Sequence, residues 1–94
     1  MKIDFSNKVV VPEHVMFKEL EGEAVLLNLD NEEYYGLDDV GTRIWEVIST
    51  SESISKAFDI LSIEYDVEPK VLEKDIKKLI GDLCEEGLVE VVTV

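Results

Sequence analysis

The chain has 94 residues, of which 46% are hydrophobic and 33% are charged. Such a length suits one domain with a modest core, and this hydrophobic content is that of a globular protein rather than of a disordered chain. The 22 acidic residues outnumber the 9 basic ones and give a formal net charge of −13. This charge favours solubility and repels the phosphates of nucleic acid over most of the surface.

The sequence also argues against a membrane or secreted protein. No apolar run is long enough to cross a bilayer, and no basic-then-apolar segment typical of a signal peptide begins the chain. Cys84 is the single cysteine, so no disulfide can form within the chain. We therefore expect a cytoplasmic protein, folded as one domain over residues 1–94.

The N-terminal segment carries weak signals. Residues 1–7 predict a loose arm or a short strand, and residues 9–11 predict an edge strand that ends at Pro12.

The rest of the first third predicts a three-stranded antiparallel meander. Its strands are residues 15–20, 23–29 and 33–37, with turns at Glu21-Gly22 and Asp30-Asn31. In the middle strand Leu27 and Leu29 alternate with Asn28 and Asp30, which is the period of a half-buried strand.

Three helices follow the meander. Asp38 or Asp39 can cap the first, over residues 40–49, and Ser53 can cap the second. Pro69 suits the first turn of the third helix, and Gly87 suits its end. Their apolar residues recur at helical spacing: Val40, Ile44, Val47 and Ile48 around Trp45; Ile54, Ala57, Phe58, Leu61 and Tyr65; Leu72, Ile76, Leu79 and Leu83.

The order of elements predicts an α+β fold. Residues 88–94 are rich in valine and predict a short C-terminal strand after the helices. A three-stranded N-terminal sheet, three helices and a closing strand make a winged-helix-like domain. We expect Trp45 and Leu79 to share the one core that joins the sheet to the helices.

Five short motifs appear in the order typical of one family. The stretch LNLDNEEYYGLDDVGTRIW (27–45) contains Leu-Asn, a turn, Tyr-Tyr-x-Leu and Gly-x-x-Ile-Trp. A helix with Ala57 and Tyr65 follows, and a third helix from Pro69 closes with Gly-Leu-Val at 87–89. Over residues 15–92 the chain resembles the PqqD-like family. These are the peptide chaperones of pyrroloquinoline quinone biosynthesis, together with the recognition elements for ribosomally made precursor peptides.

The strand over residues 33–37 is the first half of the predicted site. From the residues alone, its tyrosines could cover the core and Gly36 could mark a bulge, or the strand could be an open edge that pairs with an extended peptide. The resemblance favours the open edge, because family members bind their leader peptides there. We assign peptide contacts to this strand: Glu33, Tyr34, Tyr35, Gly36 and Leu37.

The third helix would supply the other half. Apolar residues beside its main stripe could be slack packing or the wall of a groove, and Gly81 could allow close helix packing or leave room for a ligand side chain. The hypothesis is a groove wall, with peptide contacts from Glu73, Lys77, Ile80, Gly81 and Cys84.

Four of the nine basic residues lie on this helix, at Lys70, Lys74, Lys77 and Lys78. They indicate a solvated face with a favourable Glu73–Lys77 pair. The same face could also steer an acidic peptide or imitate a DNA-reading helix, although Arg43 is the sole arginine.

Nothing in the sequence predicts catalysis. His14, Cys84 and scattered serines form no nucleophile–base pair, and the acidic clusters lack the spacing of a calcium loop. We expect no catalytic residue, no metal and no cofactor.

The function hypothesis is a non-enzymatic peptide chaperone. It would capture the leader of a ribosomally made precursor peptide by strand addition and present the precursor to a radical SAM enzyme or a leader peptidase. The alternative is a winged-helix transcription factor or a protein-interaction adaptor. A homodimer is also possible, because an open edge strand could pair with the same strand of a second copy.

Overall fold

The computed structural model describes residues 3–21 and 23–93. Gly22 of the predicted first turn, the start of the predicted arm and the last residue of the closing strand lie outside this range. The elements in chain order are β1 (Lys8–Val10), β2 (Val15–Leu20), β3 (Glu23–Asn28), β4 (Tyr34–Leu37), α1 (Asp39–Thr50), α2 (Ile54–Glu64), α3 (Pro69–Glu85) and β5 (Glu90–Val92).

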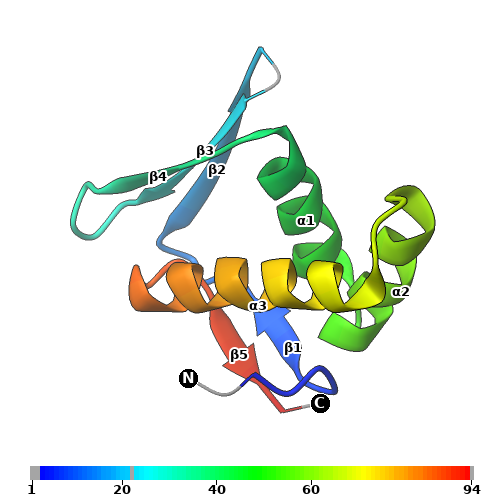
Figure 1. Ribbon diagram of the computed structural model, residues 1–94. Helices are drawn as coiled ribbons and strands as arrows, with labels where there is room; N and C mark the ends of the chain where they lie inside the picture. The colour runs from blue at the N-terminus through cyan, green and yellow to red at the C-terminus, as the bar shows by residue number, and fades with distance from the viewer. Residues whose placement is uncertain (1–2, 22, 94) are drawn as a thin grey trace.

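The strands form two separate sheets. The larger is the predicted antiparallel meander, in the order β2-β3-β4. The smaller pairs β1 with β5, which joins the start of the chain to its end. In Figure 1 the β2–β3 hairpin projects away from the helices, while α1 lies between the larger sheet and α2. The α+β fold and its element order are those that the sequence predicts.

The buried face of β3 differs from the prediction. Its core residues are Ala24, Leu26 and Asn28, whereas Leu29 is exposed. Asn28 can be buried because its side-chain oxygen accepts a hydrogen bond from the Asp30 amide at 2.9 Å, which also holds the turn. Glu32 takes the left-handed conformation in this turn, with φ of 60°.

Side chains cap two of the three helices as expected. The Asp38 carboxylate accepts a hydrogen bond from the Gly41 amide at 2.7 Å, and Ser53 Oγ accepts one from the Lys56 amide at 3.1 Å. Pro69 opens α3, and Gly87 follows it with φ of +71°, a conformation that glycine adopts without strain.

One cluster of buried residues joins the larger sheet, the three helices and the smaller sheet. Trp45 is buried in this cluster as expected, and the ring of Phe17 stacks on it with centroids 6.1 Å apart. The prediction for α3 needs correction. Ile76, Ile80 and Leu83 are completely buried, while Leu79 is only partly buried at the margin of the cluster.

The N-terminal segment is docked and is not a loose arm over residues 3–7. Its carbonyl groups accept hydrogen bonds from the first turn of α2, Ile54 to Asn7 at 2.8 Å and Ser55 to Phe5 at 2.7 Å. The Phe5 ring also packs against Phe58 at 6.0 Å between centroids. These bonds satisfy helix amides that otherwise have no partner.

Within the described part of the chain, no helix is both long and apolar enough to cross a membrane.

Two glycines in helices give a matched test of local packing. A methyl group at Gly81 would meet no atom within 4 Å, whereas one at Gly41 would lie 3.1 Å from the Asp38 carboxylate that caps α1. Gly81→Ala should raise the free energy of unfolding by about 0.5–1 kcal/mol, because alanine loses less backbone entropy. Gly41→Ala should give no such gain. Denaturant unfolding measures both, and a stabilising Gly41→Ala would contradict the tight cap.

The rotation of α3 gives a second prediction. Ile76→Ala should lower the free energy of unfolding by about 2–5 kcal/mol, the range for truncating a fully buried aliphatic side chain. Leu79→Ala should cost about half as much, because part of its side chain is already in water. Equal losses in the two variants would contradict this assignment of the buried face.

Candidate functional site

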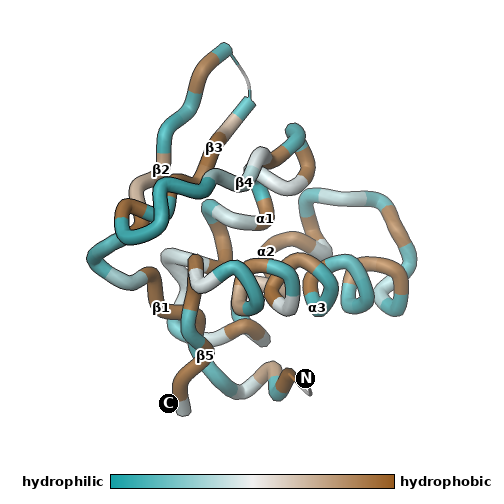
Figure 2. Tube along the Cα trace, turned by 90° about the vertical axis from the view of Figure 1, so that its left-hand side faces the viewer, coloured by the Kyte–Doolittle hydropathy of each residue, from teal (hydrophilic) through white to brown (hydrophobic). Residues whose placement is uncertain are grey.

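The outer edge of β4 is open. β4 pairs with β3 along one side, and no strand of the described residues pairs with its other side. An open edge exposes backbone N–H and C=O groups that a further extended segment can pair with. In Figure 1 this strand lies above the C-terminal half of α3, and Figure 2 also shows β4 above the helices.

The register identifies which backbone groups are free. The Asn28 amide donates a hydrogen bond to the Glu33 carbonyl at 2.8 Å, and the same register continues through Leu26–Tyr35 to Ala24–Leu37. Because hydrogen-bonded pairs alternate along an antiparallel ladder, the backbone of Tyr35 faces β3. The backbone groups of Tyr34 and Gly36 therefore point to the open edge.

Gly36 leaves the edge unobstructed. The register is continuous from Tyr34 to Leu37, so Gly36 does not mark a bulge. A Cβ at this position would meet no heavy atom within 4 Å. Close approach of another backbone is therefore sterically free at Gly36.

A groove of about 310 Å³ lies along this edge. Its walls come from β4, the start of α1 and one side of α3. The residues that line it are Tyr35, Gly36, Leu37, Asp38, Val40, Gly41, Ile44, Asp75, Lys78, Leu79 and Asp82.

The predicted β4 residues lie around the groove. Tyr35, Gly36 and Leu37 line it directly, and the Leu37 side chain reaches the core. Tyr34 is 75% exposed. Glu33 precedes the strand and is exposed.

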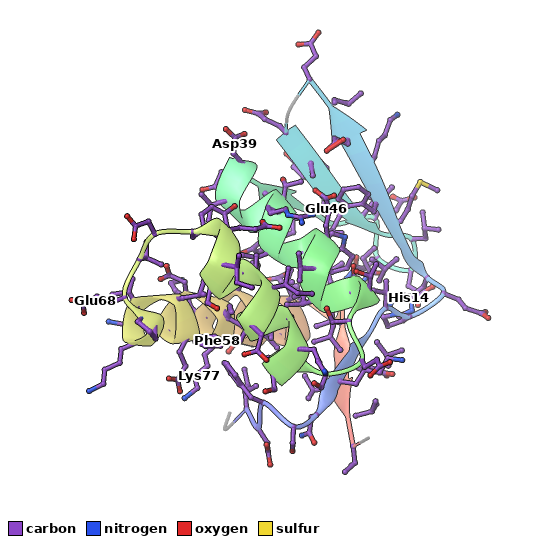
Figure 3. All side chains as sticks on the ribbon, turned by 90° about the vertical axis from the view of Figure 1, so that its right-hand side faces the viewer. His14, Asp39, Glu46, Phe58, Glu68 and Lys77 are labelled. Carbon is purple, nitrogen blue, oxygen red and sulfur yellow. The ribbon has the colours of Figure 1, made fainter. Side chains whose placement is uncertain are left out.

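The predicted α3 residues do not form the groove wall. Glu73 and Lys77 line a different hollow beside the N-terminal segment, and the Lys77 ammonium lies 5.8 Å from the Phe5 ring centroid. Figure 3 shows Lys77 far from Asp39 at the start of α1. Glu73 and Lys77 do form the expected ion pair, at 3.1 Å.

The other three predicted α3 residues also lie elsewhere. Ile80 is completely buried in the core. Cys84 packs against the core, where burial raises the pKa of its thiol. Gly81 lines none of the hollows described for the chain, and no neighbouring helix packs within 4 Å of its Cβ position.

The α3 residues that face β4 are not among the predicted site residues. They are Asp75, Lys78, Leu79 and Asp82. Residues three and four apart share a face of a helix, so these four form one stripe beside the buried one. The apolar stripe has two flanks, and the apolar residues Ile80 and Cys84 favour one of them as a groove wall in the sequence. The polar flank with Leu79 as its apolar member is the one that faces the sheet.

Tyr35 connects the two walls electrostatically. Burial is the largest cause of a raised pKa for its phenol, and the charge of Asp82 and a hydrogen bond to Asp82 add to it. The Lys78 ammonium donates a hydrogen bond to the Asp82 carboxylate at 3.2 Å, which raises the pKa of Lys78. Of the four α3 lysines, Lys78 is the one that lines the groove.

The remaining polar residues show structural contacts. A ring nitrogen of His14 lies 3.2 Å from the Gly87 carbonyl, where the larger sheet meets the end of α3. Arg43 binds both carboxylate oxygens of Glu64 and thereby ties α1 to α2. Over residues 3–21 and 23–93, no group of three or more His, Cys, Asp or Glu side chains is placed to hold a metal ion.

A family model identifies the family of this chain. Residues 23–89 match the family model described as coenzyme PQQ synthesis protein D (PqqD). Among curated proteins, none matches the sequence significantly.

Two solved structures are similar to this chain over most of its length. One is described as TbiB1 in complex with the TbiA(beta) leader peptide. It is 30% identical, covers 85% of this chain and 93% of its own, and has a TM-score of 0.78. The other is lasso peptide synthetase B1 complexed with the leader peptide. It is 25% identical in sequence, and the match covers 88% of this chain and 98% of the other, with a TM-score of 0.79. With its family-model match and its fold, the chain belongs to the PqqD family.

Proposed function

We propose that this chain is a peptide-binding module that captures the leader of a ribosomally synthesised precursor peptide. The observation that carries the proposal is the open edge of β4 beside the groove wall of α3. An extended peptide that pairs with this edge would become a fourth strand of the sheet and would lie against α3.

The edge of β4 and the groove would contribute to binding in different ways. The free backbone groups of Tyr34 and Gly36 supply hydrogen bonds that depend little on peptide sequence. Every second side chain of an added strand points to the same side, so alternate residues of the peptide enter the groove. Leu37, Val40, Ile44 and Leu79 offer them an apolar surface.

The two solved relatives support this role, because both were determined with a leader peptide bound. Their fold covers nearly the whole of this chain. We extend the same class of ligand to this protein as a proposal.

Binding alone would not process a precursor, so the proposal includes a partner. A modifying enzyme, such as a radical SAM enzyme, or a leader peptidase would act on the precursor while the leader is held. The cytoplasm, where precursors are made, is the proposed location. Self-pairing of two β4 edges would give a homodimer that competes with the peptide.

A DNA-binding role is less well supported. The sole arginine, Arg43, is held by Glu64 on the side of the molecule where α1 meets α2. The net charge of −13 opposes approach to a duplex.

Strand addition predicts a parity in the peptide. In a leader peptide from the precursor gene nearest to the gene of this chain, N-methylation of alternate residues should abolish binding, because it deletes donors that face β4. N-methylation of the intervening residues should be tolerated. Isothermal titration with both sets of peptides measures this, and equal tolerance of both would exclude strand addition.

The groove wall predicts a contrast between two residues of α3. Leu79→Ala should weaken leader binding by about tenfold, the effect of losing a well-buried apolar contact. Lys77→Ala is the matched control on the other side of the helix and should leave the affinity unchanged. Both variants are first shown to have a native-like thermal unfolding transition and are then titrated with the leader peptide. The two affinities show which side of α3 contacts the peptide. A larger effect at Lys77 would place the peptide in the hollow beside Phe5 instead.

A further inference from the structure

We infer that the groove selects a peptide segment in which a lysine or arginine stands two residues from an apolar residue. This inference rests on the proposed function and specifies the chemistry of its ligand. It comes from the charges of the groove and from the spacing of two residues on α3.

The groove is apolar in part and negatively charged overall. Three carboxylates line it, those of Asp38, Asp75 and Asp82, against the single ammonium of Lys78. A bound peptide excludes water from this narrow space, which strengthens each charge interaction. A cationic side chain is therefore favoured over an anionic one.

The carboxylates differ in availability. Asp38 accepts the capping hydrogen bond from the Gly41 amide, and Asp82 is paired with Lys78. The carboxylate of Asp75 makes no hydrogen bond or ion pair with any other residue in the described ranges, and Asp75 is exposed. Asp75 is thus the carboxylate that a ligand cation can approach without displacing a protein partner.

The negative charge continues past the end of the groove. A neighbouring hollow shares Asp38 and Val40 with the groove and adds the carboxylates of Glu23 and Asp39. Figure 3 shows Asp39 at the start of α1, close to the hairpin. A peptide that leaves the groove in this direction meets two further acidic side chains, and no basic side chain lines this hollow.

The spacing of the peptide residues follows from α3. Asp75 and Leu79 are four residues apart, which is about 6 Å along a helix. Two residues that point to the same side of a strand are separated by about 6.6 Å. A strand that runs between β4 and α3 therefore places one inward side chain beside Leu79 and the next inward side chain beside Asp75.

The other three lysines of α3 do not offset this preference. Lys77 pairs with Glu73 outside the groove, and neither Lys70 nor Lys74 lines it. A long-range attraction of cations by the net charge of −13 is expected for any cationic peptide. The test must therefore separate the local effect of Asp75 from the overall charge.

Phage display tests the ligand chemistry. The full chain is immobilised, and peptides that bind it are selected from a library of random short sequences. We expect the selected peptides to share a lysine or arginine at a fixed spacing of two from an apolar residue. Selected peptides that are neutral or acidic at that position would overturn the inference.

Two variants with the same change in charge test the position. With a selected cationic peptide, Asp75→Lys should weaken binding by about fivefold, the scale of a partly exposed charge pair. Glu73→Lys removes the same charge from the other side of α3 and should have a much smaller effect. Equal weakening by both variants would show that only the overall charge matters and would overturn the inference.

Asp75→Asn serves as a milder variant should Asp75→Lys disturb the helix, and it should give a smaller loss in the same direction. Added salt should weaken binding of the cationic peptide to the wild-type chain. The parity of N-methylation in the selected peptides separates the two proposals. Parity without a basic residue refutes only the charge preference, whereas tolerance at both parities refutes strand addition itself.

Discussion

The burial of Ile76, Ile80 and Leu83 fixes the rotation of α3 about its axis, and the site depends on this rotation. Removing these three side chains from water is worth several kcal/mol, far more than any surface contact of the same helix. With this face turned inward, Leu79 comes to the margin of the core and Asp75, Lys78 and Asp82 turn toward β4. A rotation by one residue would bring a different wall to the groove and would expose part of the core.

The second constraint is the short strand β4. Its pairing with β3 satisfies one side of its backbone, and among the described residues no strand pairs with the groups of Tyr34 and Gly36. Such an edge is prone to pair with other chains. Here α3 runs beside the edge with a polar and charged flank, and the groove between them restricts which extended chain can enter. Generic backbone pairing can thereby be combined with selection by side chains.

Charge acts at two ranges in this protein. The excess of acidic residues sets a long-range field that favours cationic ligands and opposes nucleic acid. Within the groove the pairing of Lys78 with Asp82 leaves Asp75 available. The two ranges agree in sign, so a cationic peptide would be attracted during approach and retained after binding.

Local patterns in the sequence determined the elements, because strand alternation, Asp38 and Ser53 as caps, and Pro69 at a helix start act over a few residues. Together with the Tyr-Tyr-Gly-Leu strand they also indicated the family and one side of the site. Only the tertiary structure decided which flank of α3 faces β4, which face of β3 is buried and that residues 3–7 dock on α2. The apolar stripe of α3 has apolar residues on both of its flanks in the sequence. Which flank faces β4 depends on how the helix packs against segments that are distant in the chain. That packing energy is absent from any local pattern, and for this reason the sequence alone favours a wall of Glu73, Lys77, Ile80, Gly81 and Cys84.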